Sequence, residues 1–248
     1  MSIQIRTLRK QDEKEAIRFA VSGMHFDWYF NSSILLQAYG RYFWALESNC
    51  ATQVIAAYEG NALAGVLLAK MEGEPVVRYS RRKALYVRAF DFIAHIFSKN
   101  GAGLYERTNQ ELYRRYCRNN RPDGEMRFLA ANPDLQGRGI GTLLLDELIR
   151  REHGKKLFLF TDSACTYQFY EHRGFDRAEE EDVVLDFGEK KVPLGCYLYS
   201  GILQQASSGL KNNPQSAALL HSPRNGCHAE AARTVNRREA AFAGRGQL

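Results

Sequence analysis

The chain of 248 residues is 45% hydrophobic and 25% charged, as is usual for a water-soluble globular protein, and it is long enough for one large domain or one domain with a tail. The net charge of +6 is unevenly spread, because residues 204–248 hold six basic and two acidic side chains, a net +4, which leaves +2 for the other 203 residues. A nearly neutral body argues against a broad polyanion-binding surface.

The five cysteines are scattered and form no C-x-x-C pair. This pattern predicts neither a zinc site nor a disulfide framework, so we expect no metal. No apolar run reaches the roughly 18 to 20 residues that a membrane-spanning helix needs, and the first residues have no apolar core of signal-peptide length. We therefore expect a cytoplasmic protein with no membrane partner.

The first part of the chain alternates between strand and helix patterns. Hydrophobic periodicity predicts a strand over 3–8, helices over 11–21 and 33–46, and a hairpin of strands 53–58 and 63–69. Residues 74–123 then read as a helical insertion. One helical face carries apolar residues from Leu85 to Phe97, three residues at 101–103 break the helix, and a second helix is predicted over 104–118.

The second part begins with a strand over 126–131 and a glycine-rich turn. A helix follows from about residue 140, with Ile140, Leu143, Leu144 and Leu148 on its inner face. The remaining predictions are a strand covered on both sides, a short helix and a hairpin, over 157–160, 167–172, and 183–187 with 192–199. We expect residues 204–248 to be a disordered basic tail, because they contain one aromatic residue and too little apolar surface to offset the entropy of ordering. The expected domain therefore spans 1–203.

The segment Gln136-Gly137-Arg138-Gly139-Ile140-Gly141 is the most informative part of the chain. Alternate glycines let the backbone curve closely around a ligand, and the free N–H groups of the following helix attract anions. The third glycine comes one position too early for the dinucleotide fingerprint, and no Gly-Lys-Ser/Thr follows as in a P-loop. A pyrophosphate is the expected ligand.

This Q-x-x-G-x-G pattern, directly after a strand and Pro133, resembles the acetyl-CoA signature of the GNAT superfamily of N-acetyltransferases. The preceding Leu129–Pro133 and the later segment Phe169–Phe175 are similar to two further parts of the family pattern. The resemblance implies an α/β (α+β) fold in which a mixed, mostly antiparallel sheet is flanked by helices and a splayed strand pair binds the cofactor. It departs from the family where many members have Asn and Ala, since this chain has Ser163 and Thr166.

The resemblance also implies the site residues. Backbone groups of Leu129, Ala130 and Ala131 would contact acetyl-CoA, and so would Gln136, Gly137, Arg138, Gly139, Ile140, Gly141, Thr142, Ser163 and Thr166. Tyr170 would be the general acid for the thiolate, unless its ring only packs at the helix end. Glu125 would be a base or water-relay residue, unless it is a solvated carboxylate, and alternation puts it on one strand face with Arg127 and Leu129.

Several alternatives remain open at this stage. Arg138 either contacts phosphate or lies in solvent, and Cys165 is read as an inert thiol because no histidine partner is apparent. Aromatic residues within 25–44 form either an acceptor pocket or core. The predicted activity is acetyl transfer from acetyl-CoA to a primary amine of a small molecule or protein, by a monomer or homodimer. The rivals are a non-catalytic acyl-CoA-binding or regulatory domain and, less favoured, a nucleic-acid-binding module that uses residues 81–88 and the tail.

Overall fold

The computed structural model describes residues 2–24, 32–97, 104–186 and 191–204, and within these ranges the chain forms a seven-stranded sheet of order β1-β2-β3-β4-β5-β7-β6. The strands are β1 (Ile3–Arg6), β2 (Gln53–Glu59), β3 (Ala62–Met71), β4 (Gly124–Ala131), β5 (Lys156–Asp162), β6 (Asp176–Asp186) and β7 (Lys191–Ile202). All neighbouring pairs are antiparallel except β4 and β5, which run parallel. The predicted fold, a mostly antiparallel mixed sheet flanked by helices, is confirmed.

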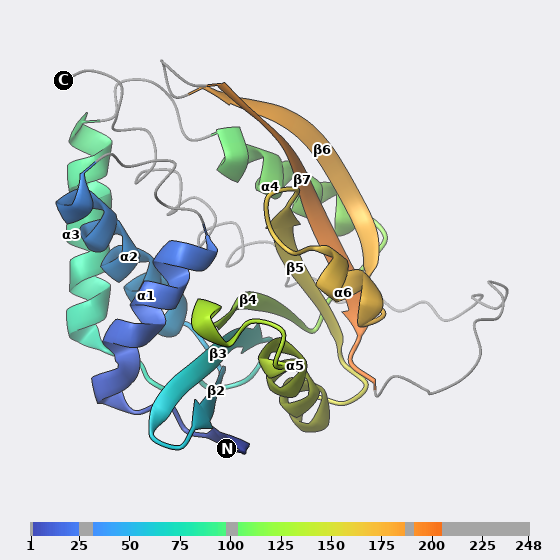
Figure 1. Ribbon diagram of the computed structural model, residues 1–248. Helices are drawn as coiled ribbons and strands as arrows, with labels where there is room; N and C mark the ends of the chain where they lie inside the picture. Colours follow the sequence, from blue (N-terminus) through green and yellow to red (C-terminus); the bar gives the residue numbers. More distant parts are fainter. Residues whose placement is uncertain (1, 25–31, 98–103, 187–190, 205–248) are drawn as a thin grey trace, which may run out of the picture.

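Helices cover both faces of this sheet (Figure 1). They are α1 (Glu13–Gly23), α2 (Ser33–Ser48), α3 (Arg81–Phe97), α4 (Leu104–Tyr116), α5 (Ile140–Arg151) and α6 (Gln168–His172), with short 3-10 turns at Lys10–Asp12 and Pro133–Leu135. On one face α1 and α2 cover the first half of the sheet, α3 packs outside α2, and α4 covers β6 and β7. On the other face lies α5. No helix in the described ranges is long and apolar enough to cross a membrane.

The alternation of side chains along β5 shows how both faces are filled. Leu157 and Leu159 pack with Leu144 and Leu148 of α5, whereas Phe158 packs with Leu112 of α4 on the opposite face. Successive side chains of a strand point to opposite faces, so a run of apolar residues forms a strand buried on both sides. The prediction of a strand covered on both sides is therefore confirmed.

Strand β4 contains a bulge at Arg127. Phe128 pairs with Leu68 and Met126 pairs with Ala69, so Arg127 is the extra residue on the bulged strand. The bulge reverses the alternation that follows it, and Leu129 packs in the cluster below α5. The prediction that Glu125, Arg127 and Leu129 share one face was wrong for Leu129, because strict alternation does not anticipate an inserted residue.

Other predictions were correct in type but not always in extent. Both helices of the predicted insertion are present as α3 and α4, but β6 begins seven residues before the predicted strand. Its first part is acidic and exposed, as suits the edge strand of the sheet, and so lacks the apolar pattern used for prediction. The buried face of α5 consists of Ile140, Leu144, Leu145, Leu148 and Ile149, so it includes two residues that were not predicted, whereas the predicted Leu143 is only half-buried. The predicted tail lies outside the described residues, except residue 204, and its disorder stays a prediction.

Candidate active site

Strands β4 and β5 separate soon after they begin (Figure 1). Their only parallel register pairs are Gly124 with Leu157 and Glu125 with Phe158 in the part of the chain that the structure describes. Beyond these pairs a cleft of about 420 Å³ opens, bounded by both strands, the glycine loop and residues of α6. The backbone N–H and C=O groups on the facing edges of the two strands are left without the partners that a continuous sheet would supply.

Most of the predicted cofactor-binding residues line this one cleft. They are Leu129, Ala130, Ala131, Gln136, Gly137, Arg138, Gly139, Ile140, Gly141, Thr142 and Thr166, together with Tyr170. Ser163 and Glu125 are not among the described residues that line it. The backbone N–H of Ser163 instead donates to the Gly195 carbonyl at 2.8 Å, and its hydroxyl accepts from the Gly195 N–H at 3.0 Å, so Ser163 ties the end of β5 to β7.

The glycine loop delivers the start of α5 to the cleft. Gly137 and Gly139 have φ of 79° and 72°, left-handed values that glycine adopts without the steric cost other residues bear. Gly139 is the N-cap of α5. The N–H groups of Ile140, Gly141 and Thr142 have no carbonyl four residues earlier within the helix, so they stay available to an anion. The loop thus fits a phosphate group on stereochemical grounds.

Gly141 differs from the two loop glycines. A Cβ placed there would meet the Phe169 ring at 3.5 Å, an ordinary contact distance. Neither backbone strain nor the protein's own packing therefore requires glycine at this position. The close approach of a ligand to the backbone is the remaining explanation for a glycine at this position.

The side chain of Arg138 pairs with Glu59 at the end of β2, with nitrogen–oxygen distances of 2.9 Å and 2.6 Å in a bidentate contact. The hydrogen bond from Arg138 and the charge of that guanidinium lower the pKa of Glu59. The ion pair contradicts the reading that the side chain simply lies in solvent, and contact with a phosphate stays a prediction. Glu59 lies 79 residues away in the chain, and no local pattern signals the pair.

Tyr170 lies on α6 with its ring against Phe169, Phe175 and Tyr199. Burial raises the pKa of its phenol above the ordinary value, and the nearby Cys165 adds to the shift. The phenol therefore keeps its proton at neutral pH, the state required of a proton donor.

Glu125 belongs to a buried ionic cluster rather than to the cleft lining. Arg127, with 3% of its side chain exposed, donates through Nη1 to Glu125 at 2.7 Å and through Nε to Glu47, which is fully buried. Burial lowers the pKa of the Arg127 guanidinium, but the charges of Glu125 and Glu47 outweigh this effect and raise it. Arg127 itself lines the cleft, and its Nη2 has no hydrogen-bond partner in the described structure. The reading of Glu125 as a solvated carboxylate is wrong.

Cys165 also lines the cleft. Burial, followed by the charge of Asp162, raises the pKa of its thiol to about 12. Since the thiolate is the nucleophilic form, the reading of Cys165 as an inert thiol agrees with this environment.

The cleft contains residues that sequence reasoning did not select. Gly23 and Met24 from the end of α1, Tyr105 from α4, and Phe160 and Asp162 from β5 all line it. Four of the aromatic residues offered for the acceptor pocket are buried in the core instead: Tyr39, Tyr42, Phe43 and Trp44. Those at 25–30 lie outside the described residues. An aromatic residue at the start of the second helix of the insertion was the only signal for Tyr105, and it does not reveal which wall of the cleft that helix joins.

No curated protein matches the chain. Similar solved structures include a histone acetyltransferase HPA2 and related acetyltransferase from Corynebacterium glutamicum, 15% identical, with a TM-score of 0.48 and coverage of 80% of this chain and 96% of that one. The PaiA N-acetyltransferase of Thermoplasma acidophilum, in complex with coenzyme A, is 16% identical, with a TM-score of 0.44 and coverage of 82% and 99%.

A third similar structure is the ribosomal-protein-S18-alanine N-acetyltransferase of Escherichia coli, 14% identical, with a TM-score of 0.42 and coverage of 85% of this chain and 100% of that one.

The decisive match is to a family model. The model described as "Acetyltransferase (GNAT) domain" matches residues 40–177, more than half of the 248 residues. The matched range contains the glycine loop, the splayed strands and Tyr170, and the chain belongs to the GNAT acetyltransferase family.

Proposed function

We propose that the protein is an N-acetyltransferase that moves the acetyl group of acetyl-CoA directly to a primary amine of a small molecule or protein. One observation carries the proposal: the glycine loop at the N-terminus of α5, the unpaired edge of β4 and the protonated phenol of Tyr170 border the same cleft. The expected cytoplasmic location, and action as a monomer or homodimer, stay predictions.

In the proposed binding mode the first-turn N–H groups of α5 hold the pyrophosphate of acetyl-CoA, and the pantetheine arm lies along β4. A backbone N–H within Leu129–Ala131 donates to the thioester carbonyl and stabilises the negative charge that develops on its oxygen. The splay of β4 from β5 supports this mode, because it leaves the backbone of β4 accessible over the length of a pantetheine arm rather than at one point.

The transfer needs three proton movements. The ammonium form of the amine loses a proton before its nitrogen attacks the carbonyl carbon, the attached nitrogen loses a second as the amide forms, and the sulfur gains one as the carbon–sulfur bond breaks. We assign the proton that the sulfur gains to Tyr170, since its phenol lines the cleft and is protonated at neutral pH. For the first we propose water, with Glu125 as relay. Glu125 lies outside the cleft lining and accepts a hydrogen bond from Arg127, so it acts on the amine through an intervening water rather than directly.

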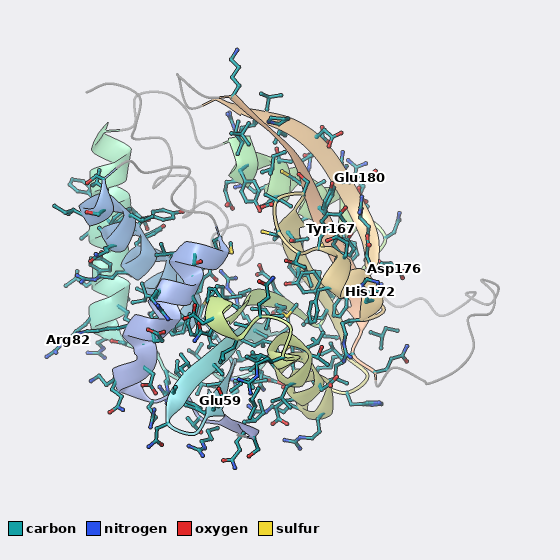
Figure 2. The ribbon with its side chains drawn as sticks, viewed as in Figure 1. Glu59, Arg82, Tyr167, His172, Asp176 and Glu180 are labelled. Atoms are coloured by element: carbon teal, nitrogen blue, oxygen red, sulfur yellow. The ribbon has the colours of Figure 1, made fainter. Side chains whose placement is uncertain are left out.

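Tyr170→Phe tests the proposal. We expect kcat for CoA thiol release to fall by about 10² to 10⁴ while the acetyl-CoA Kd measured by calorimetry changes less than about twofold. Tyr167→Phe is the matched control, because Tyr167 (Figure 2), the N-cap of α6, packs edge-on against the Tyr197 ring and is not among the described residues that line the cleft. Unchanged turnover in Tyr170→Phe would remove the residue from the mechanism. Acetyl-CoA binding without turnover on any amine would favour the non-catalytic alternative.

A further inference from the structure

The cleft has a second wall on the sheet face opposite α5. Phe158 of β5 packs against α4, and Asp162 follows four residues later, so both side chains point to the α4 face. The Tyr105 hydroxyl of α4 donates to Asp162 Oδ2 at 3.3 Å, and both residues line the cleft. Phe160 lies between them in the strand and also lines the cleft. Two aromatic rings and a carboxylate thus come together at this wall.

Asp162 is held in place by the backbone. Its Oδ1 accepts the N–H groups of Ala164 at 2.9 Å and Cys165 at 3.1 Å. Within the described ranges no Lys or Arg forms an ion pair with it. The other charged cleft-lining residues, Arg127 and Arg138, both have carboxylate partners. Asp162 is therefore the carboxylate that is left to attract a cation from solution.

The position of Asp162 decides which cation it suits. A carboxylate beside the reacting amine would stabilise its ammonium form and oppose the deprotonation that acyl transfer requires. Asp162 is instead at the end of β5, across the splay from Leu129–Ala131 of β4, to which the thioester contacts are assigned. A carboxylate across the cleft from the reacting amine favours the binding of a second cationic group, one that does not itself react.

Resting on the proposed function, we propose that the acceptor is an amine with a second positive charge, which Asp162 and Tyr105 bind while the first amine reacts. Rings beside a cation add to the attraction of the carboxylate. The helical insertion, through α4, thereby takes part in acceptor selection.

Three ligands of one length test this charge preference: cadaverine, 5-aminopentanol and 5-aminopentanoate, with cationic, neutral and anionic tails. Calorimetry on the full chain saturated with CoA measures their binding without requiring turnover. We expect cadaverine to bind about tenfold more tightly than 5-aminopentanol, a difference of about 1.4 kcal/mol, and 5-aminopentanoate to bind most weakly. Because the preference is electrostatic, it should shrink as salt is raised.

Asp162→Asn should abolish the tenfold preference, since the amide oxygen can still accept the two backbone bonds but the charge is gone. Asp176→Asn, the same change at an exposed position of β6 (Figure 2), should preserve it. Equal binding of cadaverine and 5-aminopentanol to the wild-type protein, or an unchanged preference in Asp162→Asn, would overturn the inference while leaving the proposed function intact. Failure of wild-type protein to bind CoA or acetyl-CoA would instead refute the proposed function itself.

Discussion

Replacing Glu47 tests whether the buried ionic cluster holds β4 against α2. Glu47 is fully buried and its partner Arg127 has 3% of its side chain exposed, so Glu47→Gln leaves a buried guanidinium with one carboxylate, Glu125, instead of two. Breaking a buried pair from one side costs about 3–5 kcal/mol, and retention of an amide oxygen for the hydrogen bond places Gln near the lower figure. For a domain of this size, 3 kcal/mol lowers Tm by roughly 6–12 °C.

The assay is urea unfolding followed by circular dichroism, with a thermal melt for Tm. The matched control is Glu59→Gln, which removes a carboxylate from the more exposed pair with Arg138, whose side chain is 40% exposed. Such a pair contributes about 0–1 kcal/mol. If Glu47→Gln cost less than 1 kcal/mol, no more than the control, the argument that burial makes this cluster indispensable would be refuted.

Three further predictions follow from the site and from α5. Gly139→Ala places an L-residue at φ 72°, so we expect it to lower the free energy of unfolding in urea by about 1–2 kcal/mol and to weaken acetyl-CoA binding. Gly141→Ala should change the free energy of unfolding by no more than about 0.5 kcal/mol, since a Cβ there meets only an ordinary contact. Equal losses of stability in the two variants would contradict this prediction. Glu147→Gln should cost about 0.5–1 kcal/mol at pH 7, because hydrogen bonds from Arg150 and then Arg151 lower the pKa of Glu147 to about 2. A lowered folded-state pKa stabilises above the unfolded value of 4.5 and the effect disappears as pH falls toward 2, so the difference from wild type should shrink at pH 4 and again at pH 3. Cys165, with a pKa of about 12, should react with iodoacetamide at pH 8 at least about a hundredfold more slowly in the native than in the unfolded protein, as read by peptide mass spectrometry; rapid native labelling would show that its thiol is not buried as described.

The cofactor side of the site was readable from sequence because its chemistry is local. The positive φ values at Gly137 and Gly139, the N-terminus of α5 and the position of Tyr170 on the short helix depend on residues close together in the chain. Turn stereochemistry and helix ends follow rules that act over a few residues, so the short motifs that carry the family resemblance predicted most of the residues on one side of the cleft.

The acceptor side was not readable in this way. Alternation placed Leu129 on the wrong face because the bulge at Arg127 forms only when β4 pairs with β3. Nor does periodicity distinguish an aromatic residue that fills the core, such as Trp44, from one that lines a cleft, such as Tyr105. Both residues occur at helical spacing, and only the tertiary packing of each helix determines which residues contact that face of the helix.

By itself the sequence determined the order of the helices and strands, the glycine loop and the family pattern, since each is encoded in hydrophobic period and in residues that neighbour one another. Tertiary structure alone decided the partners of the charges: Arg138 with Glu59, Arg127 with Glu47, and Asp162 with Tyr105, which are 79, 80 and 57 residues apart. Electrostatic pairing depends on distance and burial in space, and neither quantity is defined until the chain has folded.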